Sequence, residues 1–205
     1  MSEDLIQRSA EWWAVRTGKI TASRIGDMMA TTRNGWAASR RNYFHELIAE
    51  RLTGRPTIKV IRSLEARIEL EPEARIAYEF LSGHNVKEVG FIPHPLIERS
   101  GSSPDGYIGR QGQLEIKCLD PPAHIELLES GIIDPGYVYQ MQFGMACSKR
   151  KWCDFFSYSA AMPEELKTFT KRIERDNDLI GRIEQAIRDF DCEIETKIAA
   201  LRNGK

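Results

Sequence analysis

The chain has 205 residues, 41% of them apolar and 29% charged, with a formal net charge of -1. This length suits one domain with a sizeable core, and the apolar runs fall far short of the ~20 residues that a membrane-spanning helix needs. The near-neutral charge lacks the excess of Lys and Arg that marks many nucleic-acid-binding proteins, although a basic track on one face requires no such excess.

Cysteine usage and the first residues bear on the cellular compartment. The four cysteines contain no CxxC pair, which argues against a zinc site and against a disulfide framework. We interpret them as reduced, structural thiols. The chain starts with the acidic and polar residues Met-Ser-Glu-Asp-Leu, unlike a secretory signal peptide. The expected location is therefore the cytoplasm.

Residues 11–30 predict a short helix around Ile25, and Thr21 or Ser23 suits its N-cap position. The free N–H groups at a helix N-terminus carry partial positive charge. Together with the nearby Arg16 they form a candidate phosphate site. A plain capped helix with a surface arginine explains the same residues, so both interpretations stay open.

Residues 31–41 are small, polar and basic, and the pair Asn34-Gly35 is a turn signal. We therefore predict a loop in this segment. Arg33 and Arg40 are candidate phosphate contacts within it. Solvated charge is the alternative explanation for both arginines.

Two helices are predicted after this loop. Apolar side chains at three- and four-residue spacing indicate the first over residues 41–53, and Gly54 ends it. The second covers residues 63–81, where Pro72 either occupies a first turn or kinks a longer helix. Either arrangement disturbs the helix axis beside Glu71, which distinguishes this residue from the other carboxylates of the segment. A solvated glutamate on a charged helix face is the alternative interpretation.

The pattern changes to strands between residues 85 and 118. Residues 107–109 and 113–118 predict the two strands of a hairpin, with a glycine-containing turn between them. In the second strand Glu115 and Lys117 share one face, and the apolar residues share the other. The apolar face is expected to pack, which leaves the polar face free to form a site.

Three further elements are predicted towards the C-terminus. Residues 137–147 indicate a helix that carries Gln140, and the aromatic residues 151–159 indicate another strand. Apolar residues recur at threes and fours over residues 163–203, which predicts a long C-terminal helix that faces the core or a subunit interface. No linker or repeat interrupts the chain, so residues 1–205 are interpreted as a single domain.

The hairpin carries the residue types that metal-assisted phosphodiester hydrolysis needs. Two Mg²⁺ ions about 3.5–4 Å apart can activate the water and stabilise the charge on the reacting oxygens, and Mg²⁺ takes oxygen ligands. Asp105 and Glu115 are the candidate ligands, with the backbone carbonyl of Ile116 nearby. Lys117 can orient the attacking water or stabilise charge. The bare Pro-Asp and Glu-X-Lys pattern is loose, and its place on a hairpin strengthens it.

Several short motifs occur in a fixed order along the chain. They are Trp12 with Arg16-Thr-Gly-Lys-Ile-Thr-Ala-Ser23, Tyr43-Phe44-His45, Leu70-Glu71-Pro-Glu-Ala-Arg75, Ser82-Gly83, Ser103-Pro-Asp-Gly106, Leu114-Glu-Ile-Lys-Cys118 and Gln140-Met-Gln142. From Trp12 to the strand at 151–159, this series resembles the lambda-exonuclease (YqaJ-type viral recombinase) branch of the PD-(D/E)xK nucleases. The resemblance implies an α/β fold with a restriction-endonuclease-like core, in which helices flank a central mixed sheet.

The resemblance also assigns roles to the marked acids. It implies that Glu71, Asp105 and Glu115 bind two Mg²⁺ ions, assisted by the backbone carbonyl of Ile116, and that Mn²⁺ substitutes for Mg²⁺. Lys117 would be the catalytic lysine. Gln140 would support the lysine or the water at the metal site.

A second group of residues matches a pocket for the terminal 5′-phosphate of DNA. Its members are Arg16, Ser23 and Ser103. Leu64 aligns near a residue that helps to separate the terminal base pair. The resemblance thus implies a site that holds a DNA end.

The implied activity is processive 5′→3′ digestion of one strand of double-stranded DNA to 5′-mononucleotides, which leaves a 3′ single-stranded overhang for recombination. The implied partners are DNA ends, two further copies in a homotrimeric ring and a single-strand annealing protein. The implied setting is the cytoplasm of a bacterial host, with the protein encoded by a phage or prophage. One alternative is a restriction or repair endonuclease, against which the terminal-phosphate residues argue. The other is a non-catalytic DNA-binding scaffold, against which the complete set of acids and lysine argues.

Overall fold

The computed structural model describes residues 2–57 and 62–204, and it describes the side chains in these ranges except those of Glu3 and residues 62–68. Its centre is a five-stranded sheet. The strands are β4 (Val86–Lys87), β7 (Gly106–Ile108), β8 (Gly112–Cys118), β9 (Trp152–Tyr158) and β10 (Thr168–Glu174). Their spatial order is β10-β9-β8-β7-β4. β8 and β9 run parallel and the other neighbours run antiparallel, so the sheet is mixed as predicted.

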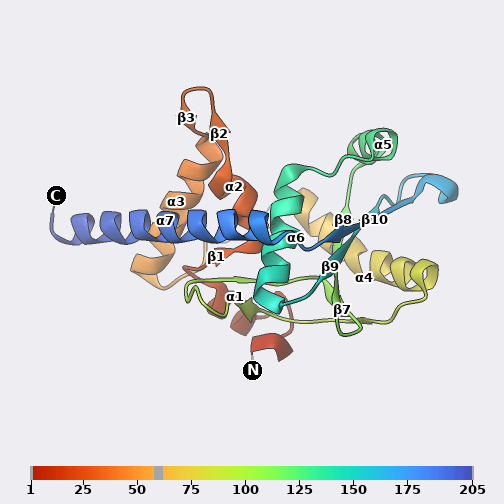
Figure 1. Ribbon diagram of the computed structural model, residues 1–205, viewed down its shortest axis with the longest axis horizontal. Coiled ribbons are helices and arrows are strands. Elements are labelled where there is room, and N and C mark those ends of the chain that lie inside the picture. Colours follow the sequence, from red (N-terminus) through yellow and green to blue (C-terminus); the bar gives the residue numbers. More distant parts are fainter. Residues whose placement is uncertain (1, 58–61, 205) are drawn as a thin grey trace.

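Some helices lie against this sheet, and the other helices, with two smaller β structures, extend to one side of it (Figure 1). The helices are α1 (Ala10–Arg16), α2 (Ile25–Met29), α3 (Ala38–Thr53), α4 (Arg62–Ser82), α5 (Pro121–Ser130), α6 (Pro135–Ser148) and α7 (Asn177–Arg202). Single 3-10 turns are η1 (Ser2–Asp4), η2 (Ala22–Arg24) and η3 (Glu164–Leu166). A small sheet of order β1-β6-β5 contains β1 (Ile20–Thr21), β5 (Ile92–Pro93) and β6 (Ser100–Ser102). A separate hairpin pairs β2 (Thr31–Thr32) with β3 (Gly35–Trp36).

The two faces of the central sheet are covered by different helices. The apolar face of β8, including Leu114 and Ile116, packs in one cluster with Tyr78 of α4. On β9, Phe156 joins that cluster, whereas its neighbour Phe155 packs in another cluster with residues of α6. Alternate residues of a strand point to opposite faces, which produces this division. The predicted separation of the two faces of β8 is therefore confirmed.

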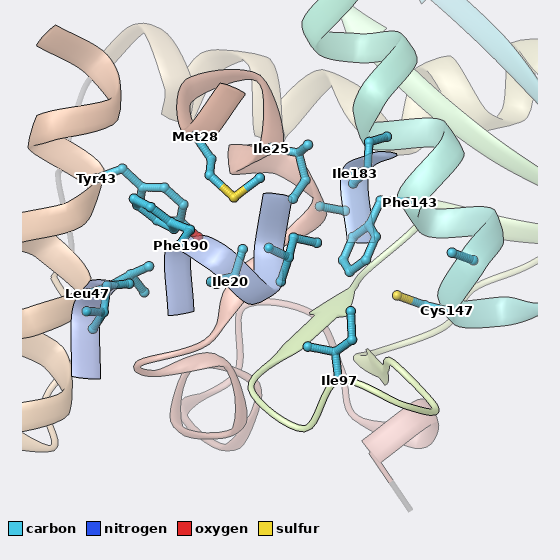
Figure 2. Packing of buried hydrophobic residues seen from close by; sticks show 14 of the residues in the cluster. Ile20, Ile25, Met28, Tyr43, Leu47, Ile97, Phe143, Cys147, Ile183 and Phe190 are labelled. Carbon is cyan, nitrogen blue, oxygen red and sulfur yellow. The ribbon is translucent and has the colours of Figure 1, made fainter. Parts of the chain in front are cut away.

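The largest apolar cluster lies beside the sheet, among α2, α3, α6 and α7 (Figure 2). Its buried α7 members are Ile180, Ile183, Ile187, Phe190, Ile194 and Ile198. They recur at threes and fours, so one stripe of the helix is buried. Burying each such side chain contributes about 1.5–3 kcal/mol relative to leaving it exposed. This stripe anchors a helix whose other faces are polar.

The predicted C-terminal helix over residues 163–203 is wrong in its first part. Residues 168–174 form β10, which pairs with β9 over the whole length of both strands. Phe169 and Ile173 are four residues apart, a spacing that places two side chains on one face of a helix and equally on one face of a strand. The free edge of β9 decides between the two, because pairing there satisfies its backbone groups. The helix itself begins at Asn177, after the N-cap Asp176.

Acidic residues of α7 hold arginines that belong to other elements. Arg51 of α3 pairs with Asp191 at 2.6 Å and with Glu195 at 2.9 Å. The Nε of Arg51 donates to the carbonyl of Gly18 at 2.8 Å, and Gly18 has a left-handed backbone with φ of 72°. α7 thereby supports, through Arg51, the turn that follows Arg16. None of the helices within residues 2–57 and 62–204 has the length and hydropathy needed to cross a bilayer.

The substitution Ile187→Ala should lower the free energy of unfolding by about 2–5 kcal/mol, because it leaves a cavity beneath α7. Ile187 has no exposed surface. Urea denaturation monitored by circular dichroism measures the change. The exposed Lys197 on the same helix provides the control, since Lys197→Ala should change stability by no more than about 0.5 kcal/mol. Equal effects of the two substitutions would show that the stripe does not anchor the helix.

Candidate active site

The hairpin of β7 and β8 positions the first acid. Gly106 pairs with Leu114 and Ile108 with Gly112, and Asp105 stands immediately before β7. Its N–H donates to the carbonyl of Leu114 at 3.2 Å, and its Oδ2 accepts from the N–H of Ile116 at 2.6 Å. A Cβ at Gly106 would lie 2.2 Å from a methyl group of Val86, so a glycine must follow Asp105 here.

The polar face of β8 presents Glu115 and Lys117 towards α6. The Nζ of Lys117 donates to Oε1 of Glu115 at 2.6 Å and to Oε1 of Gln140 at 3.2 Å. Gln140 Nε2 donates to the same oxygen of Glu115 at 2.5 Å. The ammonium group also lies 4.8 Å from the ring centre of Tyr137. Three side chains from two elements thus form a closed network around one lysine.

The other glutamine of the Gln-Met-Gln motif has a different role. Gln142 is buried, donates to the carbonyl of Glu174 at 2.8 Å and accepts from the N–H of Asp176 at 2.9 Å. It joins α6 to the junction between β10 and α7. Within the pair, Gln140 therefore binds the side chains of the site, whereas Gln142 stabilises the packing of α6 against the β10–α7 junction.

The third acid, Glu71, comes from α4 beside Pro72 and is engaged by two arginines. Oε2 pairs with Arg8, and Oε1 pairs with Nη2 of Arg75 at 3.3 Å. Only 14% of the Glu71 side chain is exposed. The helix that contains the proline thus delivers a largely buried carboxylate to the same part of the molecule as the hairpin.

One cavity of about 640 Å³ joins these residues. It brings together the residues that the sequence singled out from five separate segments. They are Arg16, Ser23, Glu71, Ser103, Asp105, Glu115, Ile116, Lys117 and Gln140. The site therefore has an acidic part and, on the same cavity wall, a part that carries an arginine and hydroxyl groups.

The acidic part holds negative charge that burial makes costly. Burial raises the pKa of Asp105 well above its usual range, and the charges of Glu115 and Glu71 raise it further. Burial also raises the pKa of Glu115, although Lys117 opposes this shift. Burial disfavours the charged form of Lys117, but Glu115 and Asp105 outweigh this effect and raise the pKa of Lys117. The lysine is therefore an ammonium donor in this arrangement.

These donors fit a hard divalent cation. Burial first, and then repulsion from Glu115 and Glu71, raise the pKa of Asp105, and a bound cation would stabilise its charged form. Across the described residues, no three His, Cys, Asp or Glu side chains stand together as a preformed cluster, and Glu71 is instead paired with its arginines. Mg²⁺ keeps several of its waters, so two carboxylates and a backbone carbonyl suffice to hold it.

The other part of the cavity is built around Arg16. Its Nη1 donates to the hydroxyl oxygen of Ser103 at 2.9 Å, and its guanidinium lies 4.1 Å from the ring centre of Trp12. Trp12 Nε1 donates to the same hydroxyl at 3.1 Å. Among the residues that the structure describes, no acid forms an ion pair with Arg16. Burial lowers the pKa of Arg16 to about 10, so the guanidinium stays charged near neutral pH. A held cation of this kind is ready to accept an anion.

Ser23 lines the cavity with an exposed side chain, but its local structure differs from the prediction. It lies inside η2, and Thr21 occupies the N-cap position of that turn without a side-chain cap hydrogen bond. The two hydroxyl oxygens are 3.5 Å apart. The helix that follows, α2, begins only at Ile25. Ser23 therefore contributes a hydroxyl at the cavity rather than an N-cap.

The remaining sequence candidates do not meet at this cavity. Arg33 is exposed at the turn of the β2–β3 hairpin, where a loop was predicted. Arg40 is buried in the first turn of α3, where its guanidinium pairs with Glu193 at 2.9 Å and stacks 3.8 Å from the ring centre of Trp36. Arg40 is thus committed to holding α7, because a buried arginine needs its acid partner. Leu64 lies outside the residues whose side chains the structure describes.

Two residues of the site were missed from the sequence. Tyr137 lies one helical turn before Gln140, so the three-residue spacing on a predicted helix was a usable signal. Arg8 had no such signal, because it stands in a segment without periodicity and its partner is 63 residues away. Only the folded chain brings it to the cavity.

The sequence matches the family described as the YqaJ-like viral recombinase domain over residues 11–151. The chain belongs to this family. The matched range agrees with the extent of the resemblance seen in the motifs, and that identification is confirmed. Among curated proteins, none matches the sequence.

Solved structures similar to this YqaJ-like protein include "an alkaline exonuclease (LHK-Exo) from Laribacter hongkongensis", with 45% identity and a TM-score of 0.88 over 96% of this chain and 97% of that one. The same exonuclease in complex with dAMP has 45% identity and a TM-score of 0.89 over the same shares of the two chains. A phage-related exonuclease from Haemophilus somnus 129PT shares the fold, with 16% identity and a TM-score of 0.69 over 89% of this chain and 96% of that one. The predicted fold class is confirmed.

In this YqaJ-like protein, the substitution Asp105→Asn should stabilise the metal-free fold at pH 8. The pKa of Asp105 is raised in the folded state, so the folded chain binds more protons than the unfolded chain, and stability falls as pH rises above the ordinary value of 3.8. Asn removes the charge and keeps an oxygen for the N–H of Ile116. Thermal unfolding in EDTA should show a Tm rise of about 2–4 °C for each kcal/mol gained by removing this buried charge.

The matched control is Asp154→Asn. Asp154 is also buried, but Arg172 binds it at 2.7 Å and Tyr78 donates to it at 2.6 Å. Neutralising it leaves an arginine without its acid and should lower Tm. The gain at Asp105 should shrink as pH falls towards 3.8. A lower Tm for Asp105→Asn at pH 8 would contradict the inference that the buried charge of Asp105 destabilises the metal-free fold.

Proposed function

We propose that this protein is a Mg²⁺-dependent 5′→3′ exonuclease of double-stranded DNA, which releases 5′-mononucleotides and leaves a 3′ single-stranded overhang. One observation carries this proposal. A single cavity combines a buried acidic site with Arg16, which forms no ion pair within the part of the chain that the structure describes. The first suits phosphodiester hydrolysis, and the second suits the phosphate at a strand end.

The assignment of this protein as a DNA exonuclease rests on its family and on the 45% identity to an alkaline exonuclease over almost the whole of both chains. The acids and the lysine that hydrolysis requires are all present here and line one cavity. That exonuclease also forms a complex with dAMP, a nucleoside monophosphate of the kind that exonucleolytic digestion releases. This supports mononucleotides as the product.

Asp105, Glu115, Glu71 and the carbonyl of Ile116 are the residues proposed to hold two Mg²⁺ ions, for which Mn²⁺ can substitute. When bound, these ions supply positive charge for the attacking water and the leaving oxygen. Lys117 remains protonated beside Glu115, so it donates to the attacked phosphate or orients the water rather than abstracting a proton. Hydrogen bonds from the lysine to Gln140 and Glu115 keep its ammonium group in place.

The part of the cavity around Arg16 explains why the enzyme would begin at an end. Arg16 and the hydroxyl of Ser103 offer a charge-assisted donor and a second polar group to a phosphate, and Ser23 adds another hydroxyl. Ser103 stands two residues before Asp105. A phosphate held at Ser103 therefore lies a short distance from the cutting site, which suits stepwise removal of nucleotides.

The two alternative functions lack this support. A restriction or repair endonuclease cuts within a strand and has no use for a terminal-phosphate pocket, whereas Arg16 is held ready for an anion. A non-catalytic scaffold has no need for a lysine fixed between a glutamate and a glutamine. Because buried charge is costly, a site without chemistry would not require these acids.

We propose a homotrimeric ring, double-stranded DNA ends as substrate and a single-strand annealing protein as the recombination partner. The family, with its viral recombinase description, is the support for these partners and for a phage or prophage origin. All four cysteines are free, which fits the cytoplasm of a bacterial host. Light scattering should report three chains per particle, and a monomer at all concentrations would exclude the ring.

The direct test uses linear duplexes labelled at one 5′ or one 3′ end, incubated with Mg²⁺ or with EDTA. We expect immediate release of labelled mononucleotide from the 5′ end, late release from the 3′ end and none in EDTA. Lys117→Ala should lose digestion, because the positive charge beside the attacked phosphate is gone. A covalently closed circle is the control, and cutting of that circle would favour the endonuclease.

The substitution Arg16→Ala should remove the preference for a 5′-phosphorylated end over a 5′-hydroxyl end. The initial rate on phosphorylated duplex should fall by about tenfold or more, since a charge-assisted hydrogen bond contributes about 1.5–3 kcal/mol. The rate on hydroxyl ends should change little. Arg33→Ala, at an exposed position away from the cavity, is the control. A parent enzyme that treats both ends alike would refute the pocket.

A further inference from the structure

Residues 2–9, the N-terminal segment, pack beside the candidate active site although they precede the family match, which begins at residue 11. The N–H of Phe91 donates to the carbonyl of Ser2 at 2.9 Å. The Nε2 of Gln7 donates to the carbonyl of Pro104 at 3.0 Å, next to Asp105, and to that of Val89 at 2.8 Å. The segment therefore packs beside the cutting site rather than trailing from it.

Arg8 is the residue of this segment whose side chain enters the site. It lines the cavity and pairs with Oε2 of Glu71, with 37% of its side chain exposed. Its backbone φ of 69° lies in the left-handed region, which is unfavourable for a side chain with a Cβ. The two neighbours of Arg8 are both fixed. Gln7 is held by its two hydrogen bonds, and Ser9 caps α1 by accepting from the backbone N–H of Trp12 at 3.1 Å. A residue kept in a strained backbone beside an active site calls for a functional explanation.

Glu71 has a second arginine partner besides Arg8. Arg75 pairs with the other oxygen of Glu71 and also with Glu88. Only 14% of its side chain is exposed, and it is absent from the described lining of the cavity. Glu71 thus shares the less exposed Arg75 with Glu88, and Arg8 is the partner that lines the cavity.

We propose that Arg8 is a DNA-binding residue that exchanges Glu71 for a phosphate of the bound strand when cations occupy the acidic site. This inference rests on the proposed function. A guanidinium fork matches carboxylate and phosphate equally well. If the oxygens of Glu71 bound a cation, Arg8 would lose its partner, and its charge would remain in the cavity, next to Gln7, which binds the carbonyl of Pro104. The N-terminal segment is then part of the substrate site.

The exchange predicts a metal-dependent effect of Arg8 on DNA affinity. The variant Arg8→Gly removes the side chain and suits the left-handed backbone, which glycine adopts freely. Affinity for a 5′-phosphorylated duplex is measured by fluorescence anisotropy in Ca²⁺, a cation that takes oxygen ligands, and in EDTA. We expect about tenfold weaker binding in Ca²⁺, the loss of one charge-assisted contact, and at most a twofold change in EDTA.

The matched control is Arg75→Gln, which removes the other partner of Glu71 without touching the cavity. Its DNA affinity in Ca²⁺ should stay within about threefold of the parent value. Arg8→Lys should lie between the parent and Arg8→Gly, because the ammonium keeps the charge and loses the fork. Thermal unfolding in EDTA verifies that each variant is folded before binding is compared.

Three results would overturn the inference. An equal loss of affinity for Arg8→Gly in Ca²⁺ and in EDTA would mean that Arg8 contacts DNA without any exchange. An equal loss for Arg75→Gln and Arg8→Gly would mean that both act only by placing Glu71. If the parent binds DNA in Ca²⁺ and Arg8→Gly binds it equally well, Arg8 does not contact DNA. That result would refute this inference and leave the proposed function standing. A parent without cation-dependent binding would instead count against the proposed function on which the inference rests.

Discussion

Buried negative charge is the constraint around which this structure is arranged. Glu71, Asp105 and Glu115 line one cavity, where burial and mutual repulsion raise the pKa of Asp105. Such charges are tolerated only when donors and cations meet them. Asp105 has the N–H of Ile116, Glu115 has Lys117 with Gln140, and Glu71 has two arginines. The charge that remains is what a divalent cation would neutralise.

These partners come from β8, α4, α6 and the segment before α1, so the sheet and its helices are needed together. The hairpin register places Asp105 next to Ile116. α6 lies on the face of the sheet to which the polar residues of β8 point, and it delivers Gln140 there. α7 acts at greater distance: Asp191 holds Arg51, and Arg51 holds the carbonyl of Gly18 behind Arg16. A helix that does not line the cavity thus contributes to the position of Arg16, the arginine of the proposed phosphate site.

The acidic site and the proposed phosphate site around Arg16 lie at the two ends of one short stretch, residues 103–105. Ser103 holds Arg16 and Trp12, and two residues later Asp105 begins the acidic network. Gln7 binds the carbonyl of Pro104 between them. Because this hydrogen bond holds the backbone between the two sites, the fold would set the distance from a bound phosphate to the proposed site of hydrolysis. This arrangement suits an enzyme that measures its cut from a strand end.

Much of the fold and of the site followed from local sequence patterns. Alternation predicted the two faces of β8, apolar spacing predicted α3 and α4, and the ordered motifs marked Glu71, Asp105 and Lys117. Tertiary structure alone decided the rest. Residues 168–174 became a strand because β9 offered an edge, Arg40 turned to Glu193 because α7 lay over it, and Arg8 met Glu71 across 63 positions. Local patterns record which face of an element is apolar, whereas contacts between distant residues depend on which elements become neighbours.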